Sequence, residues 1–185
     1  MTATARIVLL NGAGSAGKGS IAKALQTITA EPFLHVEMDA FLAMLPERCI
    51  GDPDGITFET VREDGKPVVV IRTGPVADRA FRGMRHAVAA MAAAGNNLIV
   101  DEVMLRGQMA EYETLLAPFA LFRVGVFAPL DVLEARERER GDRMIGLARW
   151  QFDRVHNGQK YDLELDTGSA TPMACALLIK RTFRL

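Results

Sequence analysis

A glycine-rich segment that contains a single lysine is the clearest chemical feature of the sequence. Its members are Gly12, Ala13, Gly14, Ser15, Ala16, Gly17, Lys18, Gly19 and Ser20. The spacing fits the phosphate-binding pattern G-x-x-x-x-G-K. In this pattern, main-chain amides of a turn and the positive end of the following helix bind phosphate oxygens, and the lysine adds a full charge. The segment therefore predicts a site for the phosphates of ATP.

A tight glycine turn that only links two elements would explain the glycines but not the lysine. The helix dipole disfavours a lysine in the first helical turn by roughly 0.3–1 kcal/mol unless an anion lies there. The pattern usually continues with Ser or Thr as a Mg²⁺ ligand, but here Gly19 intervenes before Ser20. We therefore expect Mg²⁺ either to be bound by Ser20 or to be held mainly by phosphate oxygens and water.

Two aspartates follow apolar runs that fit buried strands. Asp39 follows residues 33–38, and Asp101 follows residues 98–100. We expect Asp39 to act as the general base for an acceptor hydroxyl, the alternative being an N-cap of a short helix. We expect Asp101 to be a second metal ligand, directly or through water, the alternative being a solvated strand end.

A third group of candidates is basic. Arg136, Arg140 and Arg143 have the i, i+4, i+7 spacing that places them on one helical face. This face predicts a lid that closes over ATP and neutralises charge on the transferred group, the alternative being a solvent-exposed, salt-bridged helix. The three histidines have no predicted second ligand beside them, so the sequence indicates no histidine metal site.

An apolar acceptor pocket is a further possibility, although the same side chains fit an ordinary core. Its candidates are Met38, Phe41, Met44, Phe58 and Met104.

The elements that must position these residues alternate between strand and helix. Strands are expected at residues 7–10, 33–38, 98–102, 121–127 and 161–165, and a hairpin at 56–60 and 67–72. Helices are expected at residues 18–29, 40–45, 76–94, 108–116, 130–140, 144–154 and 172–182. This order predicts an α/β three-layer sandwich with a mostly parallel five-stranded sheet, whose ligands lie at the carboxyl ends of the strands.

Length and composition favour one globular domain over residues 1–185. Residues of about 50–74 are expected to form an insertion on the acceptor side, and residues of about 136–156 are expected to form the lid. Hydrophobic residues make up 49% and charged residues 24%, and the formal net charge is −1. This balance predicts neither a nucleic-acid partner nor a membrane-surface partner. The sequence shows no secretory leader and no membrane-spanning run, and Cys49 and Cys175 match no metal or redox spacing, so we expect a cytoplasmic protein with reduced thiols.

Five segments together resemble the chloramphenicol phosphotransferase-like family over nearly the whole chain. They are residues 10–18, the strand end at Asp39, residues 98–103, residues 136–143 and residues 155–167. The resemblance implies a fold like that of nucleoside-monophosphate and shikimate kinases, ATP as donor, and a hydroxyl of a small organic molecule as acceptor. It also implies that Asp39 is the base, that Arg140 and Arg143 belong to the lid, and that Thr167 lies near the adenine. Arg136, from the basic helical face, is expected to bind the nucleotide as well.

The expected function is thus ATP-dependent O-phosphorylation of a small hydroxylated molecule, with chloramphenicol as one candidate. The main alternative is a housekeeping kinase for a nucleotide or small metabolite. A second alternative is a nucleotide-binding module without turnover. No nucleic-acid or membrane partner is expected under any of these hypotheses.

Overall fold

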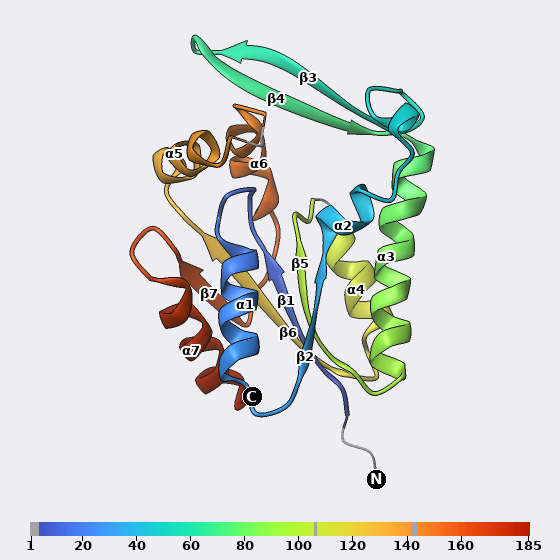
Figure 1. Cartoon of the computed structure of the whole chain (residues 1–185), viewed down its shortest axis with the longest axis vertical. Coiled ribbons are helices and arrows are strands. Elements are labelled where there is room, and N and C mark those ends of the chain that lie inside the picture. Colours follow the sequence, from blue (N-terminus) through green and yellow to red (C-terminus); the bar gives the residue numbers. More distant parts are fainter. Residues whose placement is uncertain (1–3, 106, 142–143) are drawn as a thin grey trace.

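The core of the chain is a five-stranded sheet, seen in a computed structural model that describes residues 4–105, 107–141 and 144–185. The strands are β1 (Arg6–Asn11), β2 (Phe33–Glu37), β5 (Asn97–Glu102), β6 (Ala120–Phe127) and β7 (Leu163–Asp166). Their order is β2-β5-β1-β6-β7, and every adjacent pair is parallel. Helices cover both faces, which confirms the predicted three-layer α/β sandwich (Figure 1).

The central strand β1 is buried on both faces because its side chains alternate between two cores. Val8 and Leu10 pack in the core beneath α1 (Lys18–Ile28) and α7 (Pro172–Phe183). Ile7 and Leu9 pack in the core beneath α3 (Pro75–Ala93) and α4 (Gln108–Leu115). A continuous apolar run is therefore the sequence form of this strand.

The remaining elements gather at the carboxyl ends of the strands (Figure 1). They are α2 (Met38–Leu42), the 3-10 turn η1 (Glu47–Cys49), β3 (Ile56–Glu63), β4 (Lys66–Thr73), α5 (Leu130–Arg140) and α6 (Leu147–Val155). The antiparallel β3–β4 hairpin reaches across this end from α3 to α6, where the Val69 amide donates a 3.0 Å hydrogen bond to the Gly146 carbonyl. The insertion thus touches the start of α6.

The hairpin strands are longer than the sequence predicts. Asp64 and Gly65 both have positive φ values, 49° and 75°, which suits a two-residue turn, and pairing continues up to that turn between Glu63 and Lys66. The geometry of the turn therefore extends the β3–β4 hydrogen-bond ladder over polar residues, which hydrophobic periodicity alone did not assign to strands.

Two predicted helix boundaries were wrong. The helix expected at 40–45 is α2, which begins at Met38 with Glu37 at its N-cap position, so Asp39 lies in the first helical turn. Asp39 is neither the last residue of the strand nor the cap of the helix. The helix expected at 144–154 begins at Leu147, because Gly146 has a φ of 104° that no helix accommodates.

The structure also bears on the expectations for the cysteines and for membrane-spanning helices. Both cysteines are free thiols, with Cys175 buried in the core. None of the described helices combines the length and apolarity needed to cross a bilayer. Arg143 lies outside the described residues.

Candidate active site

The predicted phosphate loop follows β1 and leads directly into α1. At Gly12, a Cβ atom would lie 2.4 Å from the Val126 carbonyl oxygen, so only glycine fits between the loop and β6. Ser15 and Gly17 have positive φ values of 63° and 87°. Left-handed residues of this kind make successive amides converge on one concave side, which is the geometry that binds phosphate oxygens.

Lys18 begins α1 and is buried inside the loop. Its Nζ atom donates hydrogen bonds of 2.9 Å to the Gly12 carbonyl and 3.0 Å to the Ala13 carbonyl. The same atom lies 3.5 Å from Oδ1 of Asp101. The ammonium group is therefore held against the loop, where it can reach a phosphate.

A cleft of about 930 Å³ opens at the carboxyl ends of the strands beside the loop. Its loop side is formed by Gly14, Ser15, Gly17, Lys18, Gly19 and Ser20. Its walls also include Asp39 from α2, Asp101 from β5 and Arg140 from α5. The structure thus brings the predicted base, the loop and one of the predicted lid arginines to a single cavity.

The proposed apolar pocket residues divide between the cleft and other places. Met38 and Phe58 line the cleft. Met104 is fully buried in the core, Phe41 packs against the same core, and Met44 is 69% exposed. The cleft also has apolar walls that the sequence did not single out, above all Phe81 of α3, together with Leu42, Ile56, Ile71, Leu105, Met144, Leu147 and Trp150.

Arg136 is hydrogen-bonded to Thr167, the residue that follows β7. Its guanidinium donates to Oγ1 of Thr167 at 3.1 Å and to the Thr167 carbonyl at 2.7 Å. The Thr167 hydroxyl in turn donates to the Ala16 carbonyl at 2.9 Å. Arg136 and Thr167 are therefore one structural unit that contacts the phosphate loop at the Ala16 carbonyl.

A group that the sequence missed lies next to Asp101. His35 and Glu37 alternate on β2 and so share one face of the sheet, and Glu37 is paired with Asp101 in the β2–β5 register. One ligand atom from each of the three side chains lies within 4.8 Å of the others. The expectation that no histidine would have a second ligand beside it was wrong. An i, i+2 spacing on a strand that adjoins Asp101 was the signal available in the sequence.

The residues present fit a divalent metal ion at this place. One imidazole and two carboxylates supply nitrogen and oxygen donors that bind such ions in proteins. Ser20 is exposed and lines the cleft, and it is not one of the three side chains of this group.

Glu102 points away from Asp101, as strand alternation predicts, and is buried on the α3 side. It accepts a 2.6 Å hydrogen bond from the Tyr112 hydroxyl and lies 3.4 Å from Nη1 of Arg85. Burial raises the pKa of this carboxyl, while Tyr112 and Arg85 oppose the rise. The cluster anchors α3 and α4 to the end of β5.

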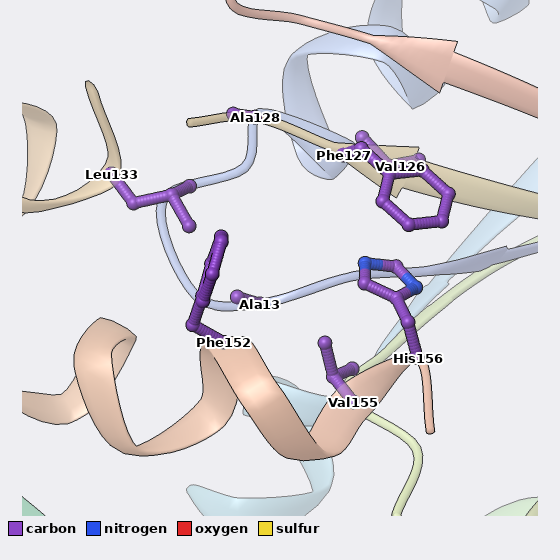
Figure 2. A pocket seen from close by; sticks show the side chains of 8 residues that line it. All are labelled: Ala13, Val126, Phe127, Ala128, Leu133, Phe152, Val155 and His156. Carbon is purple, nitrogen blue, oxygen red and sulfur yellow. The ribbon is translucent and has the colours of Figure 1, made fainter. Parts of the chain in front are cut away.

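His156 closes α6 and packs beneath the phosphate loop. Figure 2 shows its ring beside that of Phe127, around a small apolar cavity that Ala13 and Phe152 also line. The two rings are stacked with centroids 3.8 Å apart, and Nδ1 of His156 lies 2.8 Å from the Tyr161 hydroxyl. Burial, and then the positive charge of Lys18, lower the pKa of His156 to about 4. The imidazole is therefore neutral at pH 7.

Sequence comparison identifies the family to which this arrangement belongs. Residues 5–184 match the chloramphenicol phosphotransferase-like proteins. The chain belongs to this family. Proteins of two Mycobacterium tuberculosis strains, provisionally named O-phosphotransferases, are 33% identical over 174 residues, which is 91% of this chain and 77% of theirs. The family assignment confirms the resemblance and identifies the chain as a phosphotransferase-like protein.

Solved structures share the fold of this family member at low sequence identity. An APS kinase of M. tuberculosis in complex with AMPPNP and APS aligns with a TM-score of 0.69 at 15% identity, covering 98% of this chain and 99% of that chain. A tunicamycin resistance protein of Deinococcus radiodurans aligns with a TM-score of 0.66 at 16% identity, covering 98% and 96%. A shikimate kinase of Acinetobacter baumannii in complex with shikimate gives 0.57 at 12% identity, covering 98% and 94%. These likenesses establish the kinase-type fold.

Proposed function

We propose that the chain transfers the γ-phosphate of ATP to a hydroxyl of a small organic acceptor held beneath the β3–β4 hairpin. The observation that carries the proposal is that a single cleft of about 930 Å³ joins the phosphate loop, Asp39 and an apolar wall from the hairpin and α3. Donor, base and acceptor site would then meet in one cavity.

At the donor end, the loop amides and Lys18 would bind the phosphates. Nζ of Lys18 now donates to two loop carbonyls, and these neutral acceptors can be exchanged for charged phosphate oxygens, which make stronger hydrogen bonds. Mg²⁺ supplies charge neutralisation on the phosphates in enzymes with such loops. In this chain Asp101 and Ser20, which line the cleft beside the loop, would hold it together with the side chains next to Asp101.

At the transfer point, Asp39 would act as general base. The acceptor oxygen forms a bond to the γ-phosphorus, the bond from that phosphorus to the bridging oxygen of ADP breaks, and the hydroxyl proton passes to the Asp39 carboxylate. Arg140 lines the same cleft and would stabilise the charge on the transferred group. Arg143 is proposed for the same task on the strength of the family alone.

The acceptor end favours a molecule with an apolar body. The walls there are formed by Phe58 and Ile71 of the hairpin, Leu42 of α2 and Phe81 of α3, with Thr73 and Asp78 as polar groups. Apolar walls with a few convergent polar groups are typical of sites for drug-sized molecules. A chloramphenicol-like antibiotic or a related hydroxylated metabolite fits this chemistry better than a fully polar sugar.

The test is a panel of acceptors incubated with ATP and Mg²⁺, with ADP release and the mass of the product as readouts. The panel contains chloramphenicol and other aryl alcohols in one set, and shikimate, gluconate and nucleosides in the other. We expect a phosphorylated product in the first set. A product only in the second set would support a housekeeping kinase instead.

A matched pair of lysine variants distinguishes phosphoryl transfer by this chain from the activity of a contaminating kinase. Lys18→Ala should abolish product formation, whereas Lys23→Ala, which removes an exposed lysine of the same helix and cleft, should retain it. If ATP raises the melting temperature but no acceptor is phosphorylated, the chain is a nucleotide-binding module.

A further inference from the structure

The position after the loop lysine has no hydroxyl in this chain, but carboxylates border the space it leaves. A Cβ atom at Gly19 would lie 3.5 Å from Oδ2 of Asp101 and 3.6 Å from Oε1 of Glu37. In the usual pattern, a Ser or Thr at this position ligates the metal of the bound nucleotide. The place of the missing ligand is therefore bordered by two anionic oxygens.

The sheet fixes both carboxylates to this place. Glu37 is the last residue of β2 and is paired with Asp101 near the end of β5. Side chains of paired residues on adjacent strands project to the same face. Asp101 is 17% and Glu37 45% exposed, so the first oxygen donor is nearly enclosed and the second borders the cleft.

His35, two residues before Glu37 on β2, is the third member of the group with Glu37 and Asp101. Its Nδ1 atom lies 3.3 Å from Oε1 of Glu37, and its Nε2 atom lies 3.9 Å from Oδ2 of Asp101. The side chain is only 10% exposed. The ring thus lies between the two carboxylates, and one ligand atom from each of the three side chains lies within 4.8 Å of the others.

The Nε2 atom of His35 is buried without a hydrogen-bond partner among the described residues. Leaving such a buried polar atom unsatisfied is unfavourable, so the atom calls for a ligand or another explanation. The 3.9 Å separation from Asp101 is too long for a hydrogen bond. A metal ion bound by Nε2 and by the carboxylates would satisfy this atom.

Asp101 can serve both Lys18 and a cation. Its Oδ1 atom lies 3.5 Å from Nζ of Lys18, whereas its Oδ2 atom faces His35 and the space beside Gly19. The two oxygens therefore have separate partners. Binding a cation through Oδ2 does not require the lysine to leave Oδ1.

We propose that His35, Glu37 and Asp101 form a divalent-cation site that replaces the missing loop hydroxyl and favours Mn²⁺ over Mg²⁺. The preference follows from the imidazole, since nitrogen donors suit first-row transition metals while Mg²⁺ prefers oxygen ligands alone. The role of this site in phosphoryl transfer rests on the proposed function, but cation binding itself does not.

The test is a titration of the nucleotide-free chain with Mn²⁺. Binding is measured as the decrease of the free Mn²⁺ signal in electron paramagnetic resonance. We expect one saturable site, with weaker binding of Mg²⁺ measured by competition. His35→Ala and, as an isosteric variant, Glu37→Gln should each weaken Mn²⁺ binding at least about tenfold. His86→Ala, which removes an exposed histidine on α3, is the control and should bind as the wild type does.

Two results would overturn the proposal. One is the lack of saturable Mn²⁺ binding by the wild-type chain. The other is a Mn²⁺ affinity that stays unchanged in folded His35→Ala and Glu37→Gln variants, which would make the cluster a metal-free ion pair. Its failure is distinguishable from failure of the proposed function: acceptor phosphorylation without a Mn²⁺ site contradicts only this proposal, and a Mn²⁺ site without phosphorylation contradicts only the proposed function.

Discussion

The side-chain oxygen of Gln151 accepts a 2.6 Å hydrogen bond from the main-chain amide of Gly14. Gln151 lies on α6 and is buried against the cleft, and Gly14 belongs to the phosphate loop. An amide oxygen therefore occupies one of the donors expected to bind a phosphate. A phosphate that accepts from the Gly14 amide would have to displace this contact, so Gln151 of α6, inside the predicted lid segment, competes with the nucleotide for the same donor.

Removing the competitor should strengthen nucleotide binding. Gln151→Ala frees the Gly14 amide, and a neutral hydrogen bond contributes about 0.5–1.5 kcal/mol, which corresponds to roughly a 2- to 10-fold gain in ATP affinity. Isothermal titration with a non-hydrolysable ATP analogue measures this change. Gln159→Ala, in the turn after α6, is the control. A weaker affinity in Gln151→Ala would instead make the glutamine a ligand of the nucleotide.

The Thr167 hydroxyl links Arg136 to the phosphate loop, and its loss should weaken the whole unit. Thr167→Val keeps the shape of the side chain but leaves the Ala16 carbonyl and the guanidinium with one partner fewer. We expect a loss of about 1–3 kcal/mol in the free energy of unfolding, measured by urea denaturation, together with weaker ATP binding. Thr60→Val, at an exposed position of β3, should change neither the free energy of unfolding nor the ATP affinity. Wild-type stability in Thr167→Val would show that the link contributes nothing.

The neutral state of His156 predicts a dependence of stability on pH. Its pKa is lowered from 6.5 to about 4 in the folded chain. Between these values the unfolded imidazole binds a proton that the folded one does not, so acid favours unfolding. The contribution is fully present above pH 6.5 and is lost as the pH falls toward 4.

Replacing His156 by Gln should flatten this part of the profile. The measurement is the melting temperature of wild type and variant from pH 7.5 to pH 4. Because the carboxyl groups titrate in both proteins, the difference between the two curves gives the contribution of His156 alone. His86→Gln on exposed α3 should follow the wild-type curve. Parallel curves for wild type and His156→Gln would contradict the assignment of the pH dependence to this residue.

The fold and the phosphate loop could be predicted because both have local sequence signals. Buried parallel strands are continuous apolar runs, and the loop combines glycines with Lys18 at a fixed spacing. Helix ends were less certain: Asp39 lies inside α2 because that helix begins directly after β2. Such boundaries depend on one or two residues of capping geometry.

The rest of the site depends on contacts between distant segments. His35 and Glu37 meet Asp101 through the register of β2 and β5, which no single segment encodes. Gln151 reaches Gly14 only because α6 folds back over the loop. The sequence shows the helical spacing of Arg136 and Arg140, but not the hydrogen bond from Arg136 to Thr167 or the position of Arg140 at the cleft.

The most direct test of phosphoryl transfer in this cleft compares Asp39→Asn with the wild type, using the best acceptor from the panel. We expect the ATP affinity to stay within about threefold, while kcat falls at least about 100-fold because the general base is lost. Asp153→Asn, on an exposed part of α6, should retain the wild-type kcat. A wild-type kcat in Asp39→Asn would contradict the account.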